Sequence, residues 1–205
     1  MTRGRFITFE GVDGSGKSSQ VKRLAETLRA RGTTVIETRE PGGTLGAEQI
    51  RDLLVAGASE RWSPETEILL FTAARRDHVE KVIQPALEAG HTVISDRFAD
   101  STRVYQGVGR AELRQTVDEF HQMAIAMEPD LTLILDMDPE KALRRGLARD
   151  SGEDRFENFG LEFHRRLRTG FMALSREFPN RCTVIPADDG EEEVARRVLE
   201  AVDGA

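Results

Sequence analysis

The chain has 205 residues, of which 39% are hydrophobic and 32% charged, with 18 Gly and 7 Pro. This length is typical of one compact domain spanning residues 1–205, and the composition excludes collagen-like, low-complexity and wholly disordered chains. The 36 acidic and 29 basic side chains give a net charge of −7, so no overall basic field exists to hold nucleic acid or an anionic membrane. We therefore expect a soluble globular protein that binds any anion at a local site.

Five short apolar segments are predicted to be buried strands, at residues 5–9, 33–38, 92–95, 131–135 and 182–185. Helical patterns separate them. In the first pattern, apolar residues at i, i+3, i+4 and i+7 predict a helix that ends at Gly32; these residues are Val21, Leu24, Ala25 and Leu28. Further helices are expected at about 46–56, 65–89, 111–127, 139–149, 160–177 and 190–202, the second of these bent or ended near Pro85. Strands that alternate with helices predict an α/β fold with a parallel sheet covered on both faces.

The cysteine and histidine content indicates a reducing compartment. The single cysteine, Cys182, cannot form an internal disulfide, and the four histidines show no zinc-like spacing. The amino-terminal residues run directly into the first strand without a signal-peptide core, and no apolar run reaches membrane-spanning length. We expect a cytoplasmic protein with no structural metal and with neither a membrane nor a nucleic acid as partner.

Residues 11–18 read GVDGSGKS and match the pattern G-x-x-x-x-G-K-[ST] between the first strand and the first helix. The glycines let successive backbone N–H groups point inward, and the helix N-terminus adds partial positive charge. Lys17 is placed to reach the β- and γ-phosphates, and the Ser18 hydroxyl suits Mg²⁺. The motif predicts a nucleoside triphosphate site but does not identify the group that receives the phosphate.

A second carboxylate near the metal is expected at the end of a hydrophobic strand, and two candidates fit. Asp96 is favoured over Asp136 because Arg97 follows it at once and is placed to meet a second phosphate; the alternative for Asp136 is a polar residue that ends a strand. Asp13 is unusual as an anion within a phosphate-binding loop. It suits a metal-bound water, a cation or a sugar hydroxyl, or it simply forms the turn.

Several arginines fall near predicted strand ends, loops and helix starts, where open α/β sheets bind ligands. They suggest two phosphorylated substrates and a charge-rich transition state. The polar segment 150–154 lies between arginine-bearing helical patterns, so it is either part of a mobile lid at about 145–157 or a solvated loop. These arginines are Arg39, Arg51, Arg75, Arg97, Arg149 and Arg155.

The chain resembles the bacterial type of thymidylate kinase over almost its whole length. The matching segments occur in the family's order: FEGVDGSGKS at 9–18, TREPGG at 38–43, FTAAR at 71–75, DRF at 96–98, STRVYQG at 101–107, PDLT at 129–132, LD at 135–136 and DRFE at 154–157. The resemblance implies a P-loop NTPase fold of the nucleoside monophosphate kinase type, with a five-stranded parallel sheet and a short lid. It further implies Mg²⁺-dependent transfer of the γ-phosphoryl group of ATP to dTMP, which gives dTDP and ADP in dTTP synthesis for DNA replication.

The resemblance also implies roles for individual residues. Phe71 stacks on thymine, although a helical phenylalanine beside other apolar residues is also typical of a core, and Arg75 binds a base carbonyl. Thr102 and Gln106 reach the remaining base edge, and Tyr105 lies under the sugar. Arg97 holds the acceptor phosphate with Arg39 and Arg51, while Glu40 and Asp13 lie near the sugar and the metal or its water shell. The expected substrate-binding set is Arg39, Glu40, Pro41, Arg51, Phe71, Arg75, Arg97, Ser101, Thr102, Tyr105 and Gln106, with a cis peptide at Glu40–Pro41.

On the donor side, the expected metal ligands are Ser18 and Asp96. One class of the family keeps its catalytic arginine at the position occupied here by Gly14, so the resemblance assigns that role to lid arginines. The expected catalytic set is Lys17, Asp13, Arg97, Arg149 and Arg155. The expected ATP-binding residues are Gly11, Val12, Asp13, Gly14, Ser15, Gly16, Lys17, Ser18, Ser19 and Arg145.

Two residues depart from the family pattern: Phe98 stands where Tyr or His is common, and Arg103 occupies a place that is usually uncharged. Two other functions stay open, a P-loop kinase for a different acceptor and a nucleotide-binding switch that acts on a partner. The resemblance suggests a homodimer formed through helices 65–89 and 111–127, whose apolar faces could instead pack on the sheet.

Overall fold

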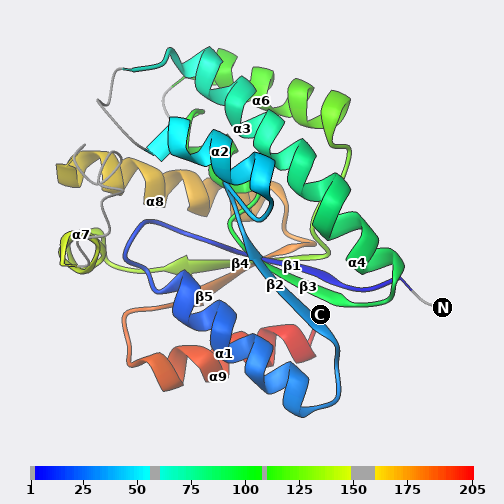
Figure 1. Ribbon diagram of the computed structural model, residues 1–205. Coiled ribbons are helices and arrows are strands. Elements are labelled where there is room, and N and C mark those ends of the chain that lie inside the picture. The colour runs from blue at the N-terminus through cyan, green and yellow to red at the C-terminus, as the bar shows by residue number, and fades with distance from the viewer. Residues whose placement is uncertain (1–2, 56–60, 108–109, 149–159) are drawn as a thin grey trace.

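A five-stranded parallel sheet in the order β2-β3-β1-β4-β5 runs through the middle of the molecule (Figure 1). The computed structural model describes residues 3–55, 61–107, 110–148 and 160–205. On the central strand, Phe9 pairs with Asp96 on one side and with Leu133 on the other. The predicted α/β architecture is confirmed. The strands are β1 (Phe6–Glu10), β2 (Val35–Arg39), β3 (Thr92–Asp96), β4 (Leu131–Asp136) and β5 (Cys182–Pro186).

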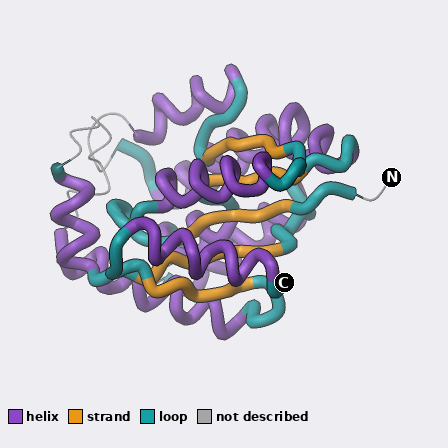
Figure 2. Tube along the Cα trace, turned by 90° about the horizontal axis from the view of Figure 1, so that it is seen from below, coloured by secondary structure: helices purple, strands orange, loops and turns teal. Residues whose placement is uncertain are grey.

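Helices cover both faces of this sheet, as Figures 1 and 2 show from two directions. One face carries α1 (Lys17–Ala30) and α9 (Glu191–Asp203). The other side carries α2 (Leu45–Val55), α3 (Pro64–His78), η1 (Val79–Ile83), α4 (Gln84–Glu88), α5 (Ala99–Tyr105), α6 (Ala111–Ala124) and α8 (Gly160–Glu177), and α7 (Pro139–Leu147) follows β4. Because the central strands are covered on both sides, their sequences read as continuous apolar runs.

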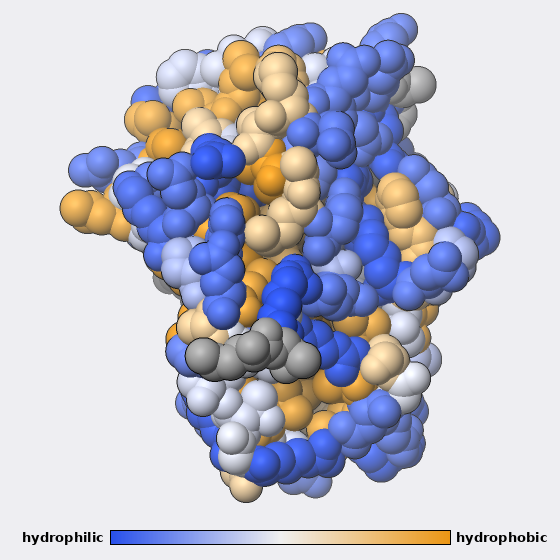
Figure 3. Space-filling model, turned by 90° about the vertical axis from the view of Figure 1, so that its right-hand side faces the viewer, coloured by the Kyte–Doolittle hydropathy of each residue, from blue (hydrophilic) through white to orange (hydrophobic). Residues whose placement is uncertain are grey.

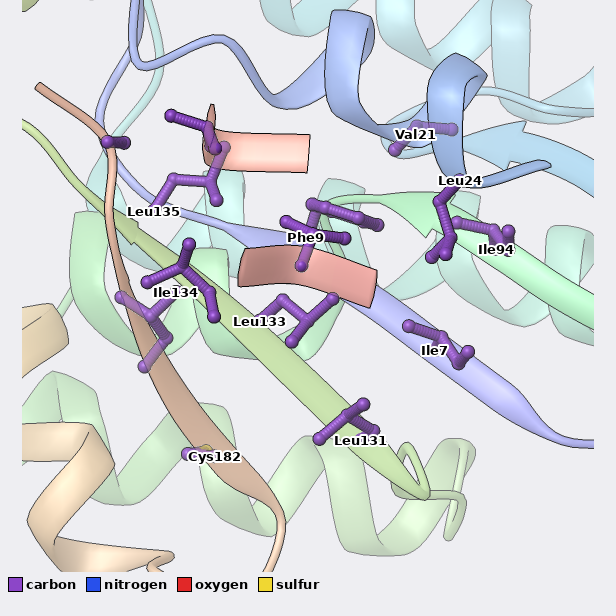
Figure 4. Close-up of a cluster of buried hydrophobic side chains, with 14 of the residues drawn as sticks. Ile7, Phe9, Val21, Leu24, Ile94, Leu131, Leu133, Ile134, Leu135 and Cys182 are labelled. Atoms are coloured by element: carbon purple, nitrogen blue, oxygen red, sulfur yellow. The ribbon is translucent and has the colours of Figure 1, made fainter. Parts of the chain in front are cut away.

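The core forms where α1 packs on the sheet, and Figure 4 shows part of it. β1 is buried along its whole length, with Ile7 and Phe9 in the core cluster. The predicted inner face of α1 is confirmed, since Val21, Leu24, Ala25 and Leu28 are all buried in the same cluster. Each large aliphatic side chain buried here stabilises the fold by about 1.5–3 kcal/mol.

The helix predicted at 65–89 runs from Pro64 to Glu88 and changes to a π-helical turn, η1, just before Pro85. The Gln84 N–H donates to the Val79 carbonyl, five residues back. Proline lacks an N–H and crowds the carbonyl four residues earlier, so a wider turn accommodates it without ending the helix. The expected irregularity near Pro85 is therefore present as a π-turn.

Each strand ends one residue later than predicted, so charged side chains gather at the carboxyl edge of the sheet. Glu10, Arg39, Asp96 and Asp136 are the last residues of β1, β2, β3 and β4. Figure 3 looks onto the opposite edge, where the chain begins and hydrophilic side chains are interspersed with apolar ones. Among the helices of the described residues, none combines the length and the apolar character that crossing a membrane requires.

Candidate active site

A cavity of about 340 Å³ lies at the carboxyl ends of the strands. The whole predicted substrate-binding set lines it, from Arg39 at the end of β2 to Gln106 after α5. Five P-loop residues also line it: Asp13, Gly14, Gly16, Lys17 and Ser18. Asp96, Val55 and Phe98 complete the lining, and sequence reasoning did not place the last two in the site. The cavity thus brings the phosphate-binding loop and the predicted acceptor residues together.

The P-loop closes tightly around the Lys17 side chain. Lys17 Nζ donates to the carbonyl oxygens of Gly11 and Val12, at 3.1 and 2.9 Å. Burial, and next the charge of Arg97, lower the pKa of Lys17 to about 8. Lys17 is therefore held at the floor of the cavity, where phosphate oxygens are better acceptors than the loop carbonyls.

Gly14 packs directly against the backbone of α7, which leaves no space for a side chain. Its φ is +82°, and a Cβ on it would lie 1.9 Å from the Ala142 carbonyl oxygen. A side chain at this position is excluded both by backbone conformation and by packing. No arginine can therefore act from here, in agreement with the expectation that transition-state charge is met from elsewhere. The predicted lid residues Arg149 and Arg155 lie outside the described residues.

Ser18 and Asp96 meet at the mouth of the P-loop, where Ser18 Oγ donates to Asp96 Oδ2 at 2.6 Å. Asp136 is engaged elsewhere, because Arg168 donates to both of its oxygens at 2.5 and 2.9 Å. Mg²⁺ commonly takes one or two protein oxygens and completes its shell with phosphates and water. The hydroxyl and carboxylate pair fits that ion, and the geometry favours Asp96 over Asp136.

Asp13 is bound on both of its oxygens. Arg97 Nη2 donates to Oδ1 at 2.5 Å, and the Tyr105 hydroxyl donates to Oδ2 at 2.7 Å. Burial alone would raise the pKa of Asp13, but the charges of Arg97 and Lys17 hold it well below its usual range. Asp13 is therefore an anion that orients the arginine and tyrosine side chains, more than a turn-forming residue.

Glu10 is a site residue that sequence reasoning missed. Its Oε1 accepts the N–H groups of Phe98 and Ser101 at 2.8 and 3.1 Å, and its Oε2 accepts the Ser101 hydroxyl at 2.6 Å. Ser101 Oγ in turn accepts from Arg97 Nη1 at 2.8 Å. Arg97 itself has a left-handed backbone, φ +73°, which a non-glycine residue adopts only when its surroundings enforce it. The hydrogen bonds of Glu10 to Phe98 and Ser101 thus fix the backbone just after Arg97.

The end of the cavity that is predicted to hold a base is built around Arg75. Arg75 Nε donates to Glu40 Oε2 at 2.7 Å, and Nη2 donates to Thr102 Oγ1 at 2.9 Å. Glu40 thus contacts Arg75 and also lines the cavity, and its place near the sugar stays a prediction. Phe71 is half-buried and lines the cavity, so it is available as a flat apolar wall.

Gln106 offers a hydrogen-bond acceptor beside this wall. Its Nε2 donates to Glu67 Oε2 at 3.2 Å. Its buried Oε1 has no hydrogen-bond partner within the described residues. Such an atom is costly to bury unless a ligand supplies a donor.

Two further arginines approach the cavity from its acceptor side. Arg39 Nη2 donates to both oxygens of Glu48, at 3.0 and 2.9 Å, and Arg51 Nη1 donates to the Pro41 carbonyl at 2.6 Å. The predicted cis peptide at Glu40–Pro41 is confirmed.

The remaining donor-side residues do not line the cavity: these are Gly11, Val12, Ser15, Ser19 and Arg145. Arg145 is exposed on α7 near Met137. Within the loop, Ser15 N donates to the Val12 carbonyl, and the Gly11 and Val12 carbonyls accept from Lys17.

The two departures from the family pattern have local explanations. Phe98 packs edge-on against Phe6, with ring centroids 4.9 Å apart, and lies 5.1 Å beneath the Arg75 guanidinium. Arg103 is buried in an ion-pair cluster with Asp100, Asp118 and Glu128 and does not line the cavity.

Comparisons with known proteins indicate one family. A family model described as thymidylate kinase matches residues 9–198. The thymidylate kinase of Jannaschia sp. (strain CCS1) is 63% identical over 193 residues, which cover 94% of this chain and 93% of that protein. That of Dinoroseobacter shibae is 63% identical over 196 residues, covering 96% and 95%. The crystal structure of thymidylate kinase from Ehrlichia chaffeensis superposes with a TM-score of 0.78 at 36% identity, covering 98% of this chain and 99% of that one.

Proposed function

This chain belongs to the thymidylate kinase family, and we propose that its cavity holds dTMP and the phosphates of ATP side by side. It is a phosphotransferase with the P-loop fold of the nucleoside monophosphate kinases, and it acts on dTMP. The reaction is transfer of the γ-phosphoryl group of ATP to dTMP, which supplies dTDP for dTTP synthesis. One observation carries the proposal: Lys17 of the P-loop and Arg97 of the acceptor site line one cavity of about 340 Å³.

The chemistry rests on alignment and charge. A phosphate monoester is already an anionic nucleophile, so no general base is needed, and the protein has to hold both substrates in line. Arg97, with Arg39 and Arg51, holds the acceptor phosphate through forked N–H donors. Lys17 and the P-loop N–H groups hold the donor phosphates.

At the base end, the donors and acceptors match a thymine edge. Phe71 provides a stacking face, Arg75 donates to a base carbonyl, and the Gln106 Oε1 accepts the ring N–H. Thr102 helps to hold Arg75. We assign the exclusion of a ribose 2′-hydroxyl to Tyr105, which lines the cavity. Cytosine presents the reverse pattern, an amino group and an unprotonated ring nitrogen, so this set rejects it.

We assign the metal site to Ser18 and Asp96, whose oxygens fit Mg²⁺. When bound, the ion neutralises charge on the donor phosphates. The side chain of Asp13 stays on Arg97 and Tyr105 and orients them. We further propose that Arg149 and Arg155, in the predicted lid segment 145–157, supply the remaining charge at the transferred phosphoryl group, because Gly14 carries no side chain. We assign Arg145 to the adenine.

The proposal extends to assembly and compartment. The helices α3 and α6 pack on each other through Ile68, Leu113 and Val117, yet each leaves a large apolar side chain exposed, Leu69 on α3 and Met123 on α6. We propose that these helices form a homodimer interface, which Leu69→Glu would weaken in sedimentation equilibrium. The buried, unpaired Cys182 supports a reducing compartment, the cytoplasm.

The test is a coupled ADP-release assay with ATP·Mg²⁺ and dTMP, dUMP, dCMP, dGMP or the ribose analogue of dTMP. We expect a strong preference for dTMP, and loss of at least about a hundredfold of kcat/KM in Arg97→Ala. Arg196→Ala, an exposed ion-paired arginine on α9, is the matched control and should keep full activity. Equal rates with another acceptor would indicate a different kinase, and nucleotide binding without ADP release would indicate a switch.

A further inference from the structure

A chain of buried polar contacts leads from the base end of the cavity to the end of β2. Arg75, Glu40 and His78 are 3%, 5% and 0% exposed. Glu40 Oε2 accepts from Arg75, and Glu40 Oε1 lies 3.1 Å from His78 Nδ1. His78 Nε2 lies 2.6 Å from Thr38 Oγ1. Both nitrogens of His78 are therefore used.

The direction of these hydrogen bonds follows from the groups themselves. Arg75 keeps Glu40 ionised, since its charge and the His78 contact hold the pKa of Glu40 below its usual value despite burial. An ionised carboxylate only accepts, so His78 Nδ1 carries the proton and donates to Glu40. The Nε2 atom lies within hydrogen-bond distance of the Thr38 hydroxyl, which can donate to it or accept from it.

Packing holds the imidazole ring in the same orientation. Gly43 has φ +90°, and a Cβ on it would lie 2.4 Å from His78 Nε2 and 2.7 Å from Thr38 Oγ1. The backbone of the loop that follows the cis Glu40–Pro41 peptide thus lies directly against the ring. The ring is fully buried beside this loop, with Nδ1 aimed at Glu40.

We propose that His78 is a positioning residue for base recognition, which acts on Arg75 through Glu40. A guanidinium has five N–H donors in a fixed plane, and fixing Nε on a fixed carboxylate sets the direction of the others. His78 does not line the cavity, so it acts on a base there only through Glu40 and Arg75. The inference rests on the proposed function, because it gives His78 a role only if Arg75 reads the base of dTMP.

Two substitutions separate this role from a general structural one. Asn places its amide nitrogen as many bonds from Cα as Nδ1, and Gln places it as many bonds away as Nε2. His78→Gln keeps a polar group near Thr38 and loses the donor to Glu40, whereas His78→Asn keeps that donor. We expect His78→Gln to raise the KM for dTMP about tenfold and leave the KM for ATP within about twofold. His78→Asn should recover most of the affinity for dTMP.

His164→Gln is the matched control, since His164 is 1% exposed, bonds from Nδ1 to the Gly160 carbonyl of its own helix, and lines no part of the cavity. It should leave the KM for dTMP unchanged. The proposal is overturned if both His78 variants change the KM for dTMP equally, or if neither variant changes it. It is also overturned if the KM for ATP rises in parallel with that for dTMP. If the His78 variants do not fold, an unchanged KM for dTMP in Thr38→Val overturns it. A wild-type protein that releases no ADP with dTMP would instead refute the proposed function.

Discussion

Replacing Glu10 with Gln changes one buried charge at the heart of the site and little else. Oε1 of either residue can accept the N–H groups of Phe98 and Ser101, as it does in the native structure at 2.8 and 3.1 Å. The Gln amide nitrogen would take the place of Oε2, which now meets the Ser101 hydroxyl. Because that hydroxyl can also accept, Gln imitates the protonated form of Glu10.

The magnitude follows from the pKa of Glu10. Burial, and next repulsion from Asp100, raise it from the ordinary value of 4.5 to about 7, although Arg97 opposes the shift. Below pH 4.5 the carboxyl is protonated in both states, and its full contribution to stability is present. Between pH 4.5 and 7 the folded protein keeps a proton that the unfolded chain loses, so stability falls by about 1.4 kcal/mol per pH unit. The total loss in the free energy of unfolding is about 3 kcal/mol. Glu10→Gln does not suffer this loss, because Gln does not ionise.

The measurement is urea unfolding followed by circular dichroism at pH 5, 6, 7 and 8. The free energy of unfolding of Glu10→Gln, minus that of the wild type, should rise by up to about 3 kcal/mol across this series. Glu193→Gln is the matched control: its arginine partners lower the pKa of Glu193 to about 2, so it is ionised in both states above pH 5 and its difference stays flat. A flat difference for Glu10→Gln as well would refute the reasoning.

Asp96→Asn should lower kcat by about a hundredfold and raise the Mg²⁺ concentration needed for half-maximal activity, as measured in the ADP-release assay. Asp136→Asn should leave that Mg²⁺ requirement unchanged and cost about 1 kcal/mol of stability through its partly exposed pair with Arg168; the reverse pattern would move the metal site to β4. Burial raises the pKa of Cys182 to about 12, so the folded protein at pH 8 should react with Ellman's reagent at least about a hundredfold more slowly than the urea-unfolded chain. Rapid reaction would show that β5 opens readily.

The strands could be predicted from sequence because burial on both faces leaves an apolar run, but their ends could not. An apolar run stops where a polar residue begins, and Glu10, Asp96 and Asp136 continue the strands that they end. Helix α5 was missed for a related reason. Its Asp100 and Arg103 are buried only because they pair with each other and with distant charges, so the sequence shows no apolar periodicity there.

Some residues of the candidate site could likewise be predicted from the sequence and others could not. Residues that belong to a contiguous motif, such as Lys17 and Arg97, were identified from spacing or resemblance. Glu10 and His78 were not, because their roles lie in bonds to residues far along the chain. One signal was present for Glu10: it directly follows a predicted buried strand, where a carboxylate is costly to bury unless several donors meet it.

The distribution of charge in the cavity resembles that of a nucleoside monophosphate, which is neutral at the base and anionic at the phosphate. At the end predicted to hold the base, Arg75 forms an ion pair with Glu40, and both side chains are almost fully buried. The pair therefore offers directed N–H groups with no net charge. At the other end, four cations line the cavity against two carboxylates, so the net charge there is positive; the cations are Lys17, Arg39, Arg51 and Arg97, and the carboxylates are Asp13 and Asp96. A phosphate gains from that positive charge, whereas a charged base edge would gain nothing at Arg75. We therefore expect the base to be recognised by directed hydrogen bonds and the phosphate by net positive charge. Arg97 lies between the two ends, where Asp13 and Ser101 hold it and Glu10 in turn holds Ser101.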